Sequence, residues 1–272
     1  MPYGIANRNG QVQLDEISAI LDLAWDRGID TLDTAKSYGT SEESIGHCMK
    51  DRSNSSWKII TKLSGNCKNI TEQIQDSFEK LTTLPTIVMA HSASLFMDTE
   101  FQEGLSNARE KQIISKIGVS LYNENEINQI MESSIKPEVI QLPLNILDTR
   151  LYRREVLTCL FEKDIEIHTR SAFLQGLFYL PQDDLKDHFV DAIPYLDKLK
   201  LIASETKLTL AELSLLWLVS LEEVSKVVIG VDNANQLNSH LKTLEKKVSP
   251  ACFEEALLIH YENENILNPS NW

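Results

Sequence analysis

The sequence predicts an α/β protein built on a parallel sheet, and three observations support this prediction. Short apolar runs of strand length alternate with longer segments in which apolar residues recur at helical spacing. Most runs are linked to the next by one helix-length segment, which is the pattern of parallel strands joined by right-handed crossovers. Polar side chains follow the ends of the first three runs, which is where a parallel barrel gathers its chemistry.

Seven strands can be assigned from the apolar runs. Gly28 comes directly before the first of them and ends the preceding helix, as a glycine after a helix often does. The predicted strands cover residues 29–34, 57–63, 86–92, 116–121, 139–145, 165–171 and 227–231.

Ten helices are predicted between and around these strands. The first is amphipathic, with Ile17, Ile20 and Leu21 at helical spacing, and Thr71 can cap the third. The predicted helices cover residues 15–27, 41–51, 71–81, 99–111, 124–132, 154–163, 194–206, 210–220, 235–245 and 250–263, the last lying outside the repeat.

These elements predict a TIM (β/α)8-type barrel in a single domain over residues 1–272. No linker, low-complexity tract or change of composition divides the chain. A closed barrel of this type has eight strands, and only seven can be assigned here. We therefore expect a barrel in which one strand is missing or incomplete.

The composition argues against several classes of protein. Hydrophobic residues make up 42% of the 272 residues, enough for a sizeable core, and the formal net charge of −14 does not suit a nucleic-acid or anionic membrane surface. No apolar stretch approaches the roughly 18 residues of a membrane span, and residues 1–7 lack the features of a signal peptide. The four cysteines are far apart without metal-ligand spacing. We expect a cytoplasmic protein with reduced thiols and no metal.

Four polar side chains at or just after the ends of the first three strands are candidate catalytic residues: Asp33, Tyr38, Lys62 and His91. Taken singly, each has a structural interpretation as a turn, packing, surface or core residue. Together, an acid, a phenol, an amine and an imidazole form a proton-donor assembly for a carbonyl group. A phenol has a pKa of about 10, so we expect the Lys62 ammonium to ease proton release from Tyr38. Asp33 would hold Lys62 charged, and His91 would orient the substrate oxygen.

Several motifs occur in a fixed order around and beyond these residues, and together they resemble the aldo-keto reductase family along nearly the whole chain. Residues 3–7 (YGIAN) are similar to a bacterial subgroup of that family linked to surface-sugar pathways. The motifs are residues 28–39 (GIDTLDTAKSYG), 41–42 (SE), 45–46 (IG), 61–63 (TKL), His91, 118–120 (GVS), 141–145 (QLPLN), 173–177 (FLQGL), 229–233 (IGVDN) and 236–237 (QL).

The resemblance implies a nicotinamide cofactor, NADPH or NADH, which supplies the hydride that no side chain can provide. Ser120 and Gln141 match positions that hold the nicotinamide carboxamide, and Leu121 stands where the family often has an asparagine. Arg170 matches an aromatic residue that stacks on the nicotinamide ring, and a planar guanidinium can also stack. The alternative for Arg170 is a salt-bridged residue at the barrel rim. The pyrophosphate channel is expected along Ser171, Phe173, Gln175, Gly176 and Leu177.

The segment after the last strand is expected to bind the adenosine end of the cofactor, through Gly230, Asn233 and Gln236. A helix N-terminus of this kind suits a phosphate group. Asp232 would repel a 2′-phosphate if it points inward, but it can equally be a turn residue, so the preference between NADPH and NADH stays open. The chain has no GxGxxG motif, so a Rossmann module is not expected.

The chain departs from the family at its beginning. Relatives usually start with a strand of the form x-L-G-x-G-T before the position of Tyr3, and here Met1 stands just after it. We therefore expect the first barrel strand to be missing or incomplete, with unpaired edges at the gap. An upstream start, a dimer partner that fills the gap, or a degraded relative with weak turnover are the competing explanations.

The leading hypothesis is reduction of a small or sugar-like aldehyde or ketone to an alcohol. One alternative is a catalytically weak or inactive relative that serves as a cofactor-sensing or partner-binding subunit. Another is barrel chemistry without hydride, such as isomerisation. Residues 178–188 can be a substrate-side flap or a solvated connector. The substrate and the oligomeric state are left open, since loop sequence does not translate into a ligand.

Overall fold

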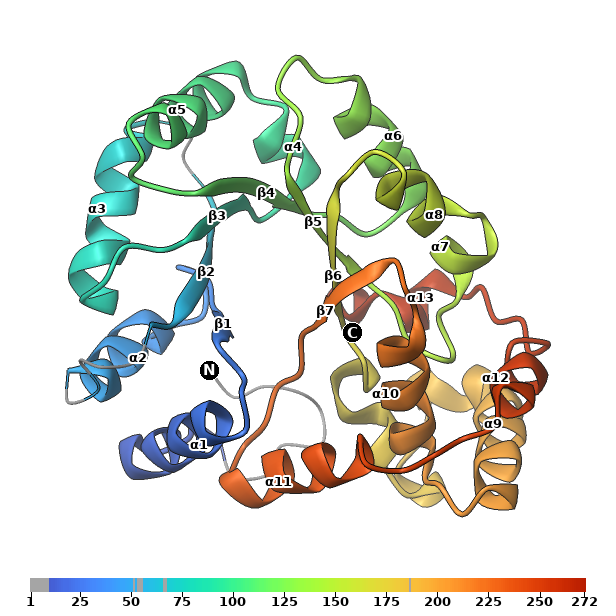
Figure 1. The fold of residues 1–272 in the computed structure, drawn as a ribbon. Helices are drawn as coiled ribbons and strands as arrows, with labels where there is room; N and C mark the ends of the chain where they lie inside the picture. Colours follow the sequence, from blue (N-terminus) through green and yellow to red (C-terminus); the bar gives the residue numbers. More distant parts are fainter. Residues whose placement is uncertain (1–9, 51, 53–55, 66–67, 186) are drawn as a thin grey trace.

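A parallel sheet of seven strands curls into the wall of a barrel, and helices cover its outer face (Figure 1). The computed structural model describes residues 10–50, 52, 56–65, 68–185 and 187–272. The strands follow one another around the wall in chain order, so each crossover leads to the neighbouring strand. They are β1 (Thr31–Asp33), β2 (Lys58–Leu63), β3 (Ile87–Ala90), β4 (Lys116–Ser120), β5 (Val139–Pro143), β6 (Glu166–Arg170) and β7 (Val224–Val227).

The helices lie mainly outside this wall. Some of their caps follow sequence rules: Thr209 and Glu212 form a capping box on α10, and Asn123 caps α6. Thr71, predicted to cap the third helix, instead lies inside α3, whose N-cap is Asn69. The α-helices are α1 (Leu14–Asp26), α2 (Ser41–Met49), α3 (Ile70–Leu81), α4 (Ala93–Phe96), α5 (Thr99–Glu110), α6 (Glu124–Glu132), α7 (Arg150–Arg153), α8 (Val156–Phe161), α9 (Ile193–Glu205), α10 (Leu210–Ser220), α11 (Ala234–Thr243), α12 (Pro250–Ala256) and α13 (Glu264–Leu267). The 3-10 helices are η1 (Leu174–Tyr179), η2 (Gln182–Asp184), η3 (Asp187–Ala192) and η4 (Pro269–Asn271).

The α/β class and the barrel type are confirmed; several element boundaries differ by one or two residues, and three predicted elements differ more. The last strand covers Val224–Val227 instead of residues 227–231, so it begins and ends earlier than predicted. The helix predicted over 154–163 is shorter, because Glu155 has a positive φ of 56° and α8 covers only Val156–Phe161. The helix predicted over 250–263 ends at Ala256, after which the carbonyl of Ile259 accepts a bond from Arg153 instead of continuing the helix.

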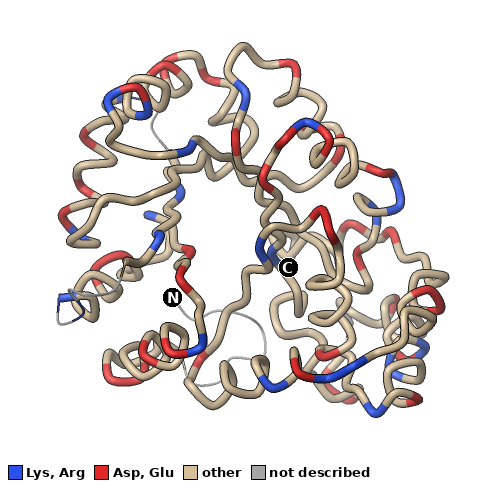
Figure 2. Tube along the Cα trace, viewed as in Figure 1, with Lys and Arg blue, Asp and Glu red and all other residues tan. Residues whose placement is uncertain are grey.

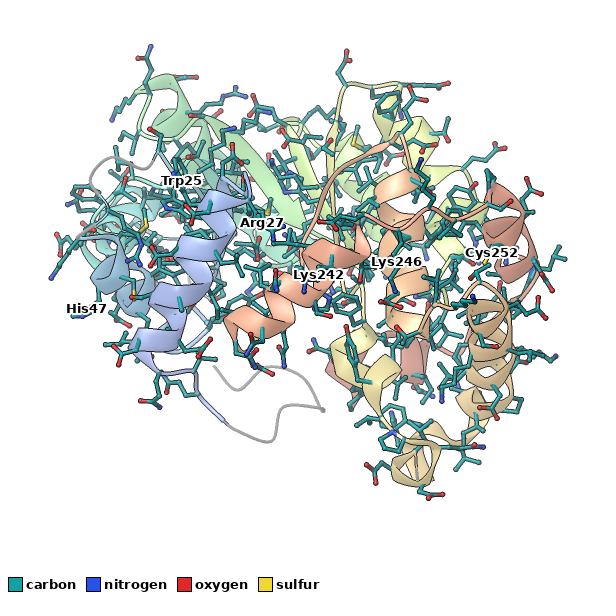
Figure 3. All side chains as sticks on the ribbon, turned by 60° about the horizontal axis from the view of Figure 1, so that its bottom comes forward. Trp25, Arg27, His47, Lys242, Lys246 and Cys252 are labelled. Atoms are coloured by element: carbon teal, nitrogen blue, oxygen red, sulfur yellow. The ribbon has the colours of Figure 1, made fainter. Side chains whose placement is uncertain are left out.

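The gap expected from the sequence lies between β1 and β7, which each have one neighbour in the described sheet. Helices α1 and α11 pack against each other below this gap (Figures 1 and 3). The guanidinium of Arg27 donates to Asn238, and the backbone N–H of Ala234 donates to the Glu16 carboxylate at 2.7 Å. The ring of helices therefore closes where the described strands do not.

Two packing layers hold the sheet in place. The main core lies between the strands and the helices, with Trp217, Phe96 and Phe101 fully buried. Inside the barrel, Ile60, Ile87, Met89 and Val139 form a separate apolar plug. This plug closes the barrel floor below the polar side chains described next.

Most charged residues lie on the helices and loops outside the sheet. Acidic residues are distributed over the surrounding helices, in line with the net charge of −14 (Figure 2). Among the residues described, no helix has the length and apolar character needed to cross a membrane.

Candidate active site

The four candidate catalytic side chains come together at the carboxyl ends of β1, β2 and β3. Asp33 ends β1, Lys62 lies near the end of β2, His91 follows β3, and Tyr38 lies in the loop between β1 and α2. The ammonium of Lys62 forms an ion pair with the Asp33 carboxylate and donates to the carbonyl of Thr34 at 3.1 Å. Lys62 is fully buried, so the carboxylate offsets the cost of placing a charge away from water.

Tyr38 lies between the amine and the imidazole. Lys62 Nζ is 5.2 Å from the centre of the Tyr38 ring, and the rings of Tyr38 and His91 meet edge to face with centres 5.8 Å apart. The structure thus brings together the phenol, the amine, the imidazole and the acid that the sequence selected. This arrangement has the groups needed to give a proton to a substrate oxygen and to orient it.

Buried hydrogen bonds fix the loop that carries Tyr38. The hydroxyl of Thr34 donates to Ser41 at 2.9 Å, and the hydroxyl of Thr61 donates to the buried carboxylate of Glu42 at 2.6 Å. Gly39 has a φ of 60°, which permits the tight turn that leads into α2. The loop therefore has defined contacts at both ends.

The electrostatics of Tyr38 differ from the sequence-based expectation. Burial raises the pKa of Tyr38 to about 12, the Asp33 carboxylate adds to this rise, and the Arg170 guanidinium opposes it. The sequence predicts that Lys62 lowers this pKa, but the net shift is upward, because burial and the Asp33 carboxylate outweigh the opposing cation. Tyr38 is thus a phenol at neutral pH, and a phenol can still protonate an alkoxide, which is a much stronger base.

His91 is a neutral imidazole at neutral pH. Burial, the largest cause, and the nearby cations Lys62 and Arg170 together lower the pKa of His91 to about 4. Burial also lowers the pKa of Lys62, which its contact with Asp33 partly opposes. The hydroxyl of Ser37 lies 3.1 Å from Nδ1 of His91. The sequence analysis missed Ser37, although a hydroxyl residue directly before Tyr38 was a visible signal.

Ser120 and Gln141, expected to hold a nicotinamide carboxamide, are register partners: Ser120 ends β4, and Gln141 lies in the middle of β5. The amide N–H of Gln141 donates to Asp33 at 2.8 Å, and its carbonyl oxygen has no partner among the described residues. The buried Ser120 hydroxyl also has no partner there. A carboxamide needs one donor and one acceptor side by side, so this pair fits the group.

Leu121 and Arg170 stand at the two positions where the resemblance in the sequence predicts an asparagine and an aromatic residue. Leu121 is fully buried and offers only backbone: its carbonyl accepts from Arg170 at 3.3 Å. The Arg170 guanidinium stacks over the ring of Tyr122 at 4.1 Å. Arg170 forms no ion pair within the described part of the chain, so the salt-bridged alternative is not observed. Tyr122, directly after β4, is a second residue that the sequence analysis missed.

The segment after β6 follows an irregular path. Ser171, Gln175 and Gly176 have positive φ values of 62°, 54° and 92°. Phe173 is buried and stacks on His240 at 4.8 Å, and Leu177 is packed in the core. The pyrophosphate role expected for this segment stays a prediction, and Leu177 can contribute only backbone to it.

Side chains of the protein already occupy the start of α11. The carboxamide oxygen of Asn233 accepts from the N–H of Gln236, and Gln236 accepts from the N–H of Asp232. The N–H of Ala234 donates to Glu16, as described above. Gly230 is exposed beside this group. The adenosine site predicted for Gly230, Asn233 and Gln236 therefore has a carboxylate at its helix N-terminus.

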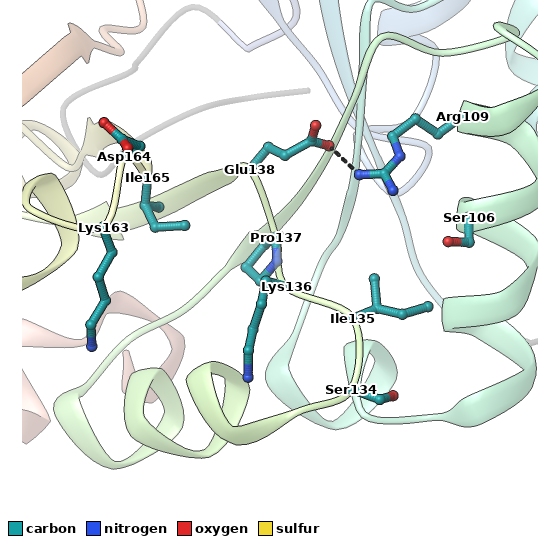
Figure 4. A pocket seen from close by; sticks show the side chains of 10 residues that line it. All are labelled: Ser106, Arg109, Ser134, Ile135, Lys136, Pro137, Glu138, Lys163, Asp164 and Ile165. Atoms are coloured by element: carbon teal, nitrogen blue, oxygen red, sulfur yellow. Dashed lines mark ion pairs between the residues drawn. The ribbon is translucent and has the colours of Figure 1, made fainter.

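A separate cleft of about 450 Å³ lies at the opposite end of the sheet, before the starts of β5 and β6 (Figure 4). Arg109 and Glu138 form an ion pair of 3.2 Å within it. The side chains of Lys136 and Lys163 also line the cleft. The candidate catalytic residues lie at the carboxyl ends of the strands, so this cleft does not belong to their site.

Comparison with known proteins assigns the chain to a family. Residues 2–256 match the model of the aldo/keto reductase family. The chain belongs to the aldo/keto reductase family and is an oxidoreductase, which confirms the resemblance found in the sequence.

Individual relatives agree with this assignment. A probable voltage-gated potassium channel subunit beta from Oryza sativa subsp. japonica is 25% identical over 281 residues, covering 86% of this chain and 84% of the relative. An aldo-keto reductase from Bacillus halodurans in its holo form has a TM-score of 0.79 at 21% identity, covering 93% of this chain and 91% of that chain. A glycerol dehydrogenase from Gluconobacter oxydans has a TM-score of 0.71 at 20% identity, covering 90% and 85%. Because these two solved structures share only 21% and 20% sequence identity with this chain, their similarity shows the fold alone.

Proposed function

We propose that this protein reduces an aldehyde or a ketone to an alcohol with NADH or NADPH, and that Tyr38 donates the proton. The observation that carries the proposal is the group at the ends of β1 to β3, where Lys62 Nζ lies 5.2 Å from the Tyr38 ring and contacts Asp33. The nicotinamide cofactor, when bound, supplies the hydride. The protein's own residues supply the proton and the orientation of the substrate.

The roles of the side chains follow from their charges. Tyr38 is protonated at neutral pH and gives its proton to the substrate oxygen as that oxygen gains negative charge. Lys62 and Arg170 are cations near the phenolate that this step leaves behind. His91 is neutral and can donate one hydrogen bond to the same oxygen. Asp33 holds Lys62 in place.

Cofactor binding is supported by the neighbouring pair Ser120 and Gln141. Their free hydroxyl and carbonyl oxygen offer a donor and an acceptor for a carboxamide, beside the proton donor. In the proposal the free face of Arg170 stacks on the nicotinamide ring, because Tyr122 covers the other face. The segment 171–177 and residues Gly230, Asn233 and Gln236 would hold the rest of the cofactor.

A second candidate function is a cofactor-sensing or partner-binding subunit with weak turnover. The likeness to a potassium channel β subunit favours this alternative. The same cofactor site would serve it, so the two functions differ in turnover and not in binding. We also propose a cytoplasmic location, in line with the three free cysteines of the described residues, Cys48, Cys159 and Cys252.

The test measures consumption of NADH and NADPH with a panel of aldehydes and ketones, alongside cofactor binding by fluorescence. Tyr38→Phe removes one hydroxyl from the proposed proton donor, so turnover should fall about 10²- to 10⁴-fold while cofactor binding is retained. Tyr152→Phe is the matched control, because that ring packs on Trp217 away from the site. Binding without turnover in the wild type selects the second function, and an unchanged Tyr38→Phe rate contradicts the proton-donor role.

A further inference from the structure

Arg170 is a half-buried cation whose charge no described carboxylate balances. Its guanidinium donates to the carbonyl of Leu121 at 3.3 Å and lies 3.5 Å from the hydroxyl of Ser171, both uncharged groups. Placing a guanidinium in a partly dry site without an anion is costly, and arginines in such places usually pair. Two other cations of low exposure among the described residues are paired: Arg150 contacts Asp148, and Lys62 contacts Asp33.

The carboxylate of Asp33, which with Arg170 acts on Tyr38, is already bound by other groups. One carboxylate oxygen of Asp33 contacts Lys62, and the other accepts from Gln141 at 2.8 Å. The group of charges around Tyr38 therefore contains two cations, Lys62 and Arg170, and one anion. In a protein of net charge −14, this pocket has a local excess of positive charge.

The position of Arg170 places this excess charge at the reacting end of the site. Arg170 ends β6, at the same carboxyl end of the sheet as Asp33, Lys62 and His91, and its charge acts on the pKa values of Tyr38, Lys62 and His91. Its Cζ lies 4.1 Å from the centre of the Tyr122 ring, and one of its N–H groups donates to Leu121, so two contacts restrain the guanidinium. A guanidinium fixed in one plane is suited to binding a carboxylate or a phosphate through two parallel hydrogen bonds.

We propose that the substrate carries an anionic group, a carboxylate or a phosphate, near its carbonyl carbon, and that Arg170 binds this group. The inference rests on the proposed reduction and adds the substrate class to it. Stacking on the nicotinamide uses the free face of the guanidinium, whereas the anion uses its N–H edge, so the two roles are compatible.

The test compares pairs of substrates that differ in the anion. The first pair is 4-oxobutanoate and its methyl ester, and the second is glyceraldehyde 3-phosphate and glyceraldehyde. We expect kcat/KM about 10- to 100-fold higher for the anionic member of at least one pair, the range of a charge-assisted hydrogen bond. If the first pair shows the difference, Arg170 binds a carboxylate, and if the second pair shows it, Arg170 binds a phosphate.

Two variants assign the preference to Arg170. Arg170→Met should remove most of the difference in kcat/KM between the members of a pair. Arg170→Lys should retain part of it, since lysine keeps the charge but cannot form two parallel hydrogen bonds. Arg154→Met is the control, because Arg154 pairs with Glu124 on the surface. Equal kcat/KM values within both pairs in the wild type, or an unchanged ratio in Arg170→Met, would overturn the proposal. Weaker cofactor binding with an unchanged ratio would assign Arg170 to the pyrophosphate instead.

Binding without turnover separates this inference from the proposed function. NMR titration of the His91 ring with 4-hydroxybutanoate or glycerol 3-phosphate should show binding that butane-1,4-diol and glycerol do not. If no aldehyde is reduced, the proposed function fails, and this titration still decides the anion site. No shift with either anion, or equal shifts with the neutral alcohols, would contradict it.

Discussion

The hydroxyl of Ser37 lies 3.1 Å from Nδ1 of His91, directly beside the phenol of Tyr38. A neutral imidazole carries one proton, and the partner of one ring nitrogen decides where that proton resides. The proposed reaction requires the Ser37 hydroxyl to donate to Nδ1, which leaves the His91 proton on Nε2 for a substrate oxygen. In that reaction Ser37 is a positioning residue.

Ser37→Ala should therefore lower kcat/KM about 2- to 10-fold, the range of one neutral hydrogen bond. The ¹⁵N shifts of the His91 ring report the tautomer and should show a larger population with the proton on Nδ1. Ser37→Thr retains the hydroxyl and serves as the control. An unchanged tautomer in Ser37→Ala would show that Ser37 does not set it.

His91 should not titrate near neutral pH, because its pKa is lowered to about 4. An NMR titration should show a constant ring signal from about pH 5.5 to 8, assigned by its loss in His91→Gln. Arg170→Met removes one of the cations that lower this pKa, so the pKa should move upward. A titration midpoint near pH 6.5 for His91 in the wild type would show that burial and the nearby cations do not lower its pKa.

The lowered pKa of His91 also determines how the free energy of unfolding changes with pH. Between the native pKa of about 4 and the ordinary value of 6.5, the unfolded chain binds a proton at His91 that the native protein does not. The free energy of unfolding contributed by His91 therefore rises with pH through this window and is lost as the pH falls through it. His91→Gln should flatten this part of the stability profile.

Strand ends were predictable from the sequence because apolar runs and the polar residues after them are local features. Asp33, Lys62 and His91 stand at such ends, and the structure places them together. The pKa of Tyr38 was not predictable, since it depends on Arg170, 132 positions further along the chain, and on burial.

Glu16 is expected to disfavour NADPH relative to NADH. Its carboxylate accepts from the N–H of Ala234 at 2.7 Å, at the start of α11 where the adenosine end is predicted. A carboxylate there occupies a natural anion site and repels a 2′-phosphate. Glu16→Gln should raise NADPH affinity relative to NADH about fivefold, the effect of roughly 1 kcal/mol between charges about 4 Å apart in water. Fluorescence titration with both cofactors measures this ratio.

Asp15→Asn is the matched control, because it changes the same charge on the same turn of α1 but from an exposed position. Its effect on the ratio should be small, since an exposed charge is screened. A ratio that changes equally in both variants would point to net charge alone. No change in Glu16→Gln would place the adenosine end elsewhere.

Thr61 and Thr169 form a matched pair for stability. Both are fully buried strand residues. The hydroxyl of Thr61 donates to the buried Glu42 carboxylate at 2.6 Å, whereas the hydroxyl of Thr169 has no hydrogen-bond partner among the residues that the structure describes. Thr61→Val leaves the Glu42 oxygen without its donor and should lower the free energy of unfolding by about 1–3 kcal/mol.

Thr169→Val removes a hydroxyl that is buried without a partner, so it should leave stability unchanged or raise it. Denaturant unfolding followed by circular dichroism measures both variants. Because Glu42 lies at the start of the helix that follows the Tyr38 loop, Thr61→Val should also lower turnover, and Thr169→Val should not. Equal losses of stability in the two variants would show that side-chain shape, and not the bond to Glu42, sets the contribution of Thr61.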